Sequence, residues 1–148
     1  MGEENIGGLK FIASMFRMVI KEIDNIMGAE SLQTIFRLIG ESVGENVAQR
    51  ISASTPEEFA EKFNKDVLVP VLGEGGTEIT IEGNEIHVVL KVCPFQNAGI
   101  DISNKFYCTY TEGLIETAAK SSLDVSEFKS EKLRAVDNCD CSFRIVLE

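Results

Sequence analysis

Four cysteines are the residues of this sequence with the clearest capacity for chemistry. Cys93 follows an alternating apolar stretch and Cys108 falls near the start of a helical stretch. Cys139 and Cys141 form a C-x-C pair beside a turn. Zinc and iron–sulfur clusters both take four cysteine ligands. Free cysteine is also a common small apolar core residue, and this spacing matches no standard zinc ribbon or ferredoxin motif. The cysteines therefore predict either one shared metal site or separate core thiols.

Other residues offer little catalytic chemistry. His87 is the single histidine, so no Ser-His-Asp or Cys-His arrangement can be argued from the sequence. The glycine-rich stretch from Gly73 to Gly76 lacks the lysine of a phosphate-binding loop, and Glu74 within it would repel phosphate. No catalytic residue is predicted.

Helices are expected in the first half of the chain. Apolar residues recur at three- and four-residue steps over 9–26, which predicts one buried helical face, and again over 31–51. A third helix is indicated by Thr55-Pro56-Glu57-Glu58, where threonine is the N-cap and Pro56 takes the first helical position.

Strands and one further helix are expected after Pro70. Alternating residues over 77–82 and 85–92 flank the two-residue turn Gly83-Asn84, which predicts a hairpin. A helical pattern covers about 103–121, and two last strands are expected around 130–136 and 141–147, beside the turn Asp137-Asn138. No linker or repeat interrupts the chain, so residues 1–148 are predicted to form a single α+β domain.

Gly40, Gly44 and Ala48 form a stripe of small residues beside the apolar face of the second helix. Such a stripe allows another backbone or a bound ligand to approach closely. Tight helix packing is the favoured interpretation, because glycine in a helix costs about 1 kcal/mol that must be offset elsewhere.

Charge excludes some partners. The chain has 14 basic and 24 acidic residues and a formal net charge of −10, with its basic residues scattered. Nucleic acids and anionic membrane surfaces would repel such a chain, so neither is expected as a partner. The N-terminal residues show neither a signal peptide nor a membrane span, and a reducing cytoplasm is the expected compartment.

Several motifs together indicate a family. The stretch from Phe106 to Ile115, then Glu131, then the segment from Asp137 to Ile145 occur in an order that resembles the 4-vinyl-reductase-type (hydrocarbon-binding) small-molecule-binding domain. The glycine-spaced helix over 37–48 is similar to one in that family. Cys93-Pro94-Phe95 is similar to a C-P-F motif of related archaeal output domains and of aminothiazoline-carboxylate hydrolase relatives.

The resemblance implies a fold shared with vesicle-tethering and haem-type gas-sensor domains. In that fold N-terminal helices pack on an antiparallel sheet and enclose a pocket. The resemblance also implies a homodimer joined through the N-terminal helices and a small apolar or aromatic ligand. Phe106, Tyr110, Gly40 and Gly44 are the residues expected beside that ligand.

A zinc site is implied by the phenol-sensing members of the family, in which cysteines and a glutamate bind the metal. Cys108, Glu131 and Cys141 match those positions here, and the remaining family cysteine is replaced by Arg134. Cys93 and Cys139 are the residues that would complete a four-ligand set. Zinc is favoured, with an iron–sulfur cluster as the alternative.

Three functions follow from these observations. The first is a non-catalytic sensory or carrier module that binds a small ligand and has a cysteine-rich metal site. The second is an enzyme, either a hydrolase or a reductase of the same superfamily. The third is a scaffold protein that dimerises through its first two helices.

Overall fold

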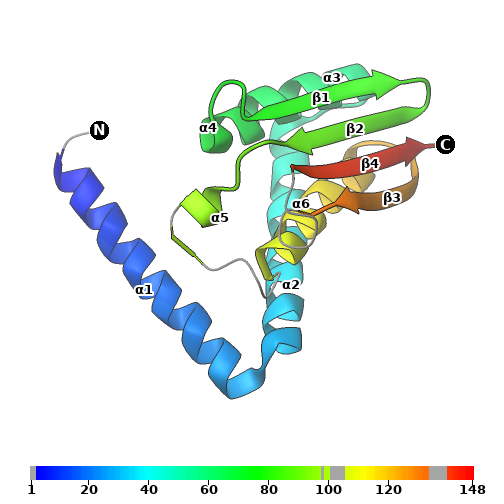
Figure 1. Cartoon of the computed structure of the whole chain (residues 1–148). Helices are drawn as coiled ribbons and strands as arrows, with labels where there is room; N and C mark the ends of the chain where they lie inside the picture. The colour runs from blue at the N-terminus through cyan, green and yellow to red at the C-terminus, as the bar shows by residue number, and fades with distance from the viewer. Residues whose placement is uncertain (1–2, 98, 101–105, 134–139) are drawn as a thin grey trace.

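Two long helices lead the chain and diverge from a sharp bend. In the computed structural model, which describes residues 3–97, 99–100, 106–133 and 140–148, α1 spans Glu3–Met27 and α2 spans Ala29–Ile51. Only Gly28 separates them, with a φ of 89° that favours glycine. Figure 1 shows α1 extending away from the rest of the molecule, while α2 runs behind the sheet.

A continuous helical segment follows α2. It comprises α3 (Pro56–Phe63), the π-helical η1 (Asn64–Leu68) and the short α4 (Val69–Leu72). The predicted N-cap is confirmed, because the backbone N–H of Glu58 donates to Thr55 Oγ1 at 3.2 Å. This helical segment includes Pro70, the residue after which the sequence predicts strands instead of helices.

The sheet contains four antiparallel strands among the described residues. They are β1 (Thr77–Glu82), β2 (Glu85–Leu90), β3 (Val125–Lys132) and β4 (Cys141–Leu147), in the order β1-β2-β4-β3. The predicted hairpin at Gly83-Asn84 is confirmed. Between β2 and β3 lie the short α5 (Pro94–Asn97), where no helix was predicted, and α6 (Phe106–Ser122).

Strand β3 corrects one predicted boundary. The strand starts at Val125 instead of about residue 130, while 134–136 and the predicted turn at Asp137-Asn138 lie outside the described residues. Its sequence, VSEFKSEK, has little apolar alternation, and its pairing with β4 contains two irregularities. Strand pairing, which the local pattern does not reveal, therefore determines where β3 begins.

The main core lies between the sheet and helices α2, α3 and α6. Its fully buried members include Phe59 and Phe63, whose rings stack with centroids 5.1 Å apart, and Phe143 on β4. The opposite face of the sheet is polar and carries ion pairs such as Lys91–Glu78 at 3.5 Å. This one-sided arrangement is usual for an antiparallel sheet and confirms the predicted α+β class.

Helices α2 and α6 cross in direct backbone contact. A Cβ atom at Gly44 would lie 2.6 Å from the Leu114 carbonyl oxygen, and one at Gly113 would lie 2.7 Å from the Arg37 carbonyl oxygen. Gly40 faces the Tyr110 carbonyl in the same way. The glycines are therefore required by helix packing, the interpretation favoured from the sequence.

Substitution of Gly44 tests this contact. Because the added methyl group would meet backbone, Gly44→Ala should lower the free energy of unfolding by about 1–3 kcal/mol. Gly8→Ala in α1 is the matched control: no atom lies within 4 Å of its Cβ position, and alanine favours helix, so stability should rise slightly. Urea unfolding measures both changes, and equal stability of the two variants would contradict the packing argument.

Candidate functional site

Three cysteines from separate parts of the chain line one small cavity. Cys93 follows β2, Cys108 lies in the first turn of α6, and Cys141 is the first residue of β4. The cavity has a volume of about 30 Å³. Its other lining residues are apolar or uncharged: Leu90, Val92, Pro94, Phe95, Tyr107, Thr111, Leu133 and Phe143. The fold thus brings together cysteines that are far apart in sequence.

The thiols are well shielded from solvent. Cys93 and Cys108 are 6% and 2% exposed, and Cys141 is half-buried. The backbone N–H of Gln96 donates to Cys93 Sγ at 3.4 Å. The fourth predicted ligand, Cys139, lies outside the described residues.

Within the described part of the chain the predicted metal ligands do not form a complete set. No group of three or more His, Cys, Asp or Glu side chains there is arranged to hold a metal ion. Glu131, another of the predicted ligands, is exposed on β3, where its Oε1 lies 3.2 Å from Arg144 Nε. In the described residues, three thiols are the predicted ligands that lie together. The binding of zinc or of an iron–sulfur cluster therefore stays a prediction.

Burial controls the chemistry of Cys108. Loss of hydration raises the pKa of its thiol to about 11. A hydrogen bond with Tyr107 acts against this rise, and the negative charges of Cys141 and Glu112 add to it. The thiol is therefore protonated at neutral pH and is a poor nucleophile. A metal ion would have to displace that proton in order to bind.

The residues predicted to line a ligand pocket do not surround an open space. Gly40 and Gly44 pack against the backbone of α6, and the half-buried Tyr110 lies edge-on to Phe95, with ring centroids 6.1 Å apart. The Phe106 side chain lies outside the described structure. The nearby cavity of about 30 Å³ is far below the roughly 300 Å³ of a typical small-molecule site.

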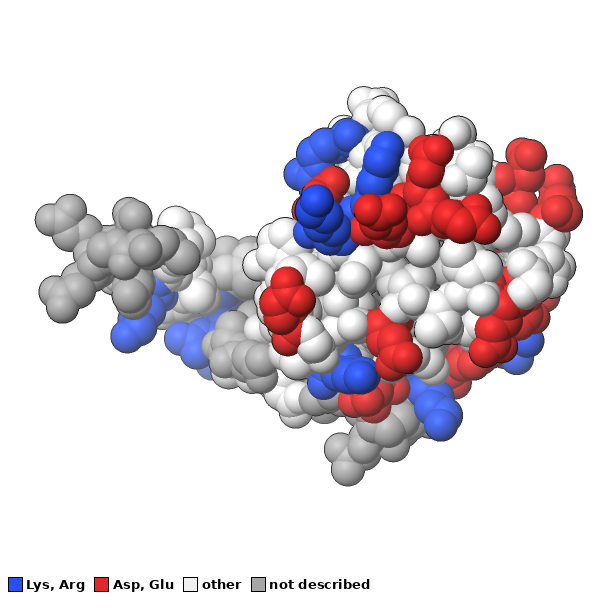
Figure 2. All heavy atoms as spheres, turned by 90° about the horizontal axis from the view of Figure 1, so that it is seen from above, with Lys and Arg blue, Asp and Glu red and all other residues white. Residues whose placement is uncertain are grey.

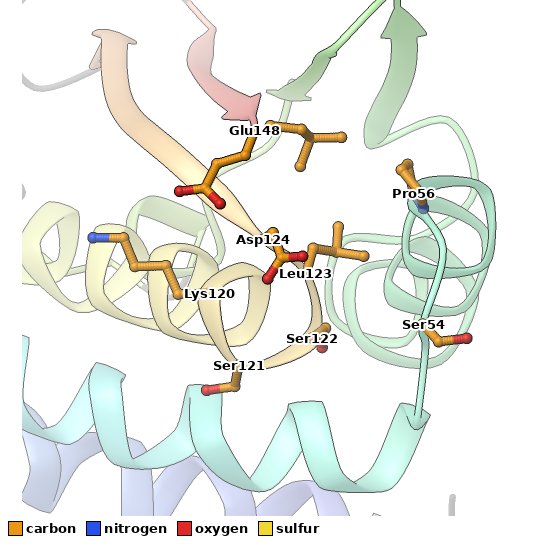
Figure 3. Close-up of a pocket in the computed structure, with 9 residues that line it drawn as sticks. Ser54, Pro56, Lys120, Ser121, Ser122, Leu123, Asp124 and Glu148 are labelled. Carbon is orange, nitrogen blue, oxygen red and sulfur yellow. The ribbon is translucent and has the colours of Figure 1, made fainter.

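A larger groove lies at the far end of α6. It has a volume of about 350 Å³ and is lined by residues including Ser54, Lys120, Asp124 and Glu148. Figure 3 shows Lys120 and Glu148 on one side of this groove and Ser54 and Pro56 on the other, with Asp124 and Leu123 between them. Its lining contains hydroxyls, carboxylates and an ammonium group, but neither cysteine nor histidine.

His87 is remote from the thiols. Its Nε2 lies 3.0 Å from Glu85 Oε2 and 3.9 Å from Glu82 Oε2, and the residue is not part of the cavity lining. These pairs place His87 in the ion-pair network on the polar face of the sheet. Among the described residues, His87 therefore contacts carboxylates and is not one of the residues that line the thiol cavity.

Helix α1 exposes an apolar surface that the sequence did not reveal. The periodicity over 9–26 predicted one buried face, but the structure buries only Ile20 fully. Nine other large apolar side chains of the helix are exposed: Leu9, Phe11, Ile12, Met15, Phe16, Met18, Val19, Ile26 and Met27. We call them the α1 surface. Met15, Met18 and Met27 lie at helical spacing, and their sequence pattern predicts core positions, but the structure leaves all three more than half exposed.

Charges on the molecule are mixed. Figure 2 shows basic side chains lying beside acidic ones on the face viewed from above, without an extended basic area. None of the helices in the described residues has the length and apolar character needed to cross a bilayer.

Taken together, helices on one face of a four-stranded antiparallel sheet define an α+β fold of the vesicle-tethering type. The fold is shared with subunit 3 of a trafficking protein particle complex from Naegleria fowleri, whose crystal structure has palmitic acid covalently bound. The TM-score is 0.66 at 16% sequence identity, and the match covers 99% of this chain and 97% of that one. At this identity the similarity establishes the fold. No known protein family and no curated protein matches the sequence.

The raised pKa of Cys108 predicts a pH-dependent stability. The folded protein holds the thiol proton more tightly than the unfolded chain, so the stability is present below about pH 9 and is lost as pH rises toward 11. Cys108→Val should flatten this decline. Urea unfolding of both proteins between pH 8 and about pH 11 is the measurement. A parallel decline in both would show that other groups cause it.

Proposed function

We propose that this chain is a non-catalytic scaffold subunit that forms a homodimer. The observation that supports this function is the α1 surface, since soluble monomers rarely expose contiguous apolar patches larger than a few hundred Å². The structural neighbour is named as a subunit of a larger particle, which agrees with a role in assembly.

The chemistry of the described residues also favours a non-catalytic role. The thiols are buried, the pKa of Cys108 is raised, and His87 pairs with Glu85 on the opposite face of the sheet. Nucleophilic catalysis needs an activated nucleophile with a base within hydrogen-bond reach. No such pair occurs among these side chains.

Mass measurement in solution tests the homodimer. Size-exclusion chromatography with light scattering should give twice the chain mass of 16.3 kDa, with no other protein added. The mass should fall toward the monomer value only on strong dilution, because an interface of standard size gives a stable dimer. A monomer at every concentration would contradict the proposal.

A small-molecule-binding module with a metal site is the second candidate. The observation that favours it is the convergence of Cys93, Cys108 and Cys141 on one cavity. In this alternative Cys93, Cys108 and Cys141 would hold the zinc together with Cys139, the predicted ligand outside the described residues. The metal would connect the segment after β2 with α6 and β4. An apolar ligand would require the cavity to expand first, because its present volume accommodates only one or two water molecules. A long acyl chain like the neighbour's palmitic acid does not fit there.

Elemental analysis tests the second candidate. Protein purified without oxygen should contain about one equivalent of zinc, or show the brown absorbance of an iron–sulfur cluster. Cys108→Ser should then lower metal content and thermal stability together, because a structural metal contributes directly to folding. Ser42→Ala, an exposed change on α2, is the control. Metal well below one equivalent in the unmodified protein would refute this candidate.

A further inference from the structure

The sheet has two edge strands that differ in character. They are β1 and β3, and Figure 1 shows β1 on the outer side of β2. Strand β3 has two irregularities in its pairing, and Lys129 and Lys132 are exposed on it. Bulges and lysines keep an edge strand from pairing with another chain. Strand β1 pairs with β2 in an unbroken register from Thr77 to Glu82 and contains neither lysine nor proline. Strand β1 is therefore the unprotected edge of the sheet.

The hydrogen-bond pattern shows which backbone groups of β1 point away from the sheet. The Lys91 N–H donates to the Gly76 carbonyl oxygen at 2.9 Å, so residues 76 and 91 form a hydrogen-bonded pair. Hydrogen-bonded and non-hydrogen-bonded pairs alternate along antiparallel strands. The N–H and C=O groups of Thr77, Ile79 and Ile81 therefore point outward. Among the described residues, no strand pairs with this side of β1.

The apolar side of β1 is incompletely covered. Ile79 and Ile81 pack on the main core, but both are only half-buried. The residues opposite them on β2, Val88 and Ile86, are fully buried. A strand added beyond β1 would place its own apolar side chains beside the two isoleucines, because neighbouring strands align side chains on the same face.

The charge around β1 indicates which kind of strand would fit. Residues 73–85 contain four glutamates and no basic residue. Glu78 and Glu82 lie on the polar side of β1, with side chains 56% and 76% exposed. Lysine or arginine on an added strand would form favourable cross-strand pairs with them, whereas a second copy of β1 would bring glutamates near glutamates. The charge pattern therefore favours a basic segment over a second copy of this strand.

We propose that the outer edge of β1 binds an extended, basic segment of a partner protein, which adds a fifth strand to the sheet. Main-chain hydrogen bonds to Thr77, Ile79 and Ile81 hold the segment. Its basic side chains, at alternate positions, pair with Glu78 and Glu82, and the apolar side chains between them cover the isoleucines. The net charge of −10 favours the approach of such a segment. This surface goes beyond the scaffold function proposed above and does not depend on the homodimer.

A designed peptide tests strand addition directly. The probe is a fluorescein-labelled hexapeptide of alternating lysine and valine, and fluorescence anisotropy at low ionic strength measures its Kd. In a strand, the lysine N–H groups point to one edge and the valine N–H groups to the other. N-methylation of the residues of one type should therefore weaken binding by roughly tenfold or more, while N-methylation of the other type should leave Kd nearly unchanged.

Charge reversal in the protein locates the binding site. Glu78→Lys and Glu82→Lys should each raise the Kd of the unmodified peptide by roughly two- to fivefold, because each loses an exposed charge pair. Glu127→Lys is the matched control, since Glu127 is an exposed glutamate on β3 at the opposite edge of the sheet. Thr77→Pro removes one outward N–H at the first position of the strand, where proline is tolerated, and should also weaken binding. Circular dichroism confirms that each variant is folded.

Each other outcome overturns the proposal. Absence of peptide binding does so, and so does binding that both N-methylated peptides retain or both lose. An effect of Glu127→Lys as large as that of Glu78→Lys would reveal unspecific charge attraction. Assemblies of the unmodified chain larger than a dimer, dissociated by Thr77→Pro, would make a second copy the occupant of the edge. The homodimer is judged separately by its mass, so it can stand when this proposal fails.

Discussion

The backbone contact between α2 and α6 is the constraint on which the rest of the structure depends. Helices at ordinary packing distance are separated by side chains, but here Gly40, Gly44 and Gly113 allow the two backbones to touch. The crossing places Arg37 of α2 at 3.0 Å from Glu116 of α6, so a partly buried ion pair adds to the packing. Because the sheet packs on these same helices, their separation determines the depth of the main core.

Close packing of α2 and α6 also explains the small size of the thiol cavity. Cys108 and Tyr107 belong to the first turns of α6 and are therefore held near α2, where Leu32 and Phe36 pack in the same apolar cluster. Strand β4 carries Cys141 to the opposite wall, next to Phe143. This cavity is too small for a ligand of ordinary size.

The features of the fold that depend on a few neighbouring residues could be predicted from the sequence, whereas those that depend on strand pairing could not. The Thr55 cap and the Gly83-Asn84 hairpin depend on neighbouring residues, and both were predicted correctly. For Gly40 and Gly44 the helix pattern favoured packing while the resemblance placed them beside a ligand, and the structure shows them packed against α6. The start of β3 depends on pairing with β4, and its residues give no periodic signal. Glu131 was assigned by resemblance, and its ion pair with Arg144 depends on strand register, which local sequence does not provide.

The prediction that α1 buries one apolar face within its own chain was wrong, because most of that face is exposed. Periodicity shows that a helix face must be covered, but it does not show by which chain. Ile20 anchors α1 in the cluster that also contains Cys93 and Cys108, so the helix reaches its own body at the wall of the thiol cavity. This cluster therefore joins α1 to residues that line the candidate ligand site. Tyr107 and Cys108 belong both to the cavity lining and to this cluster, so a change in their positions would also alter the packing of Ile20.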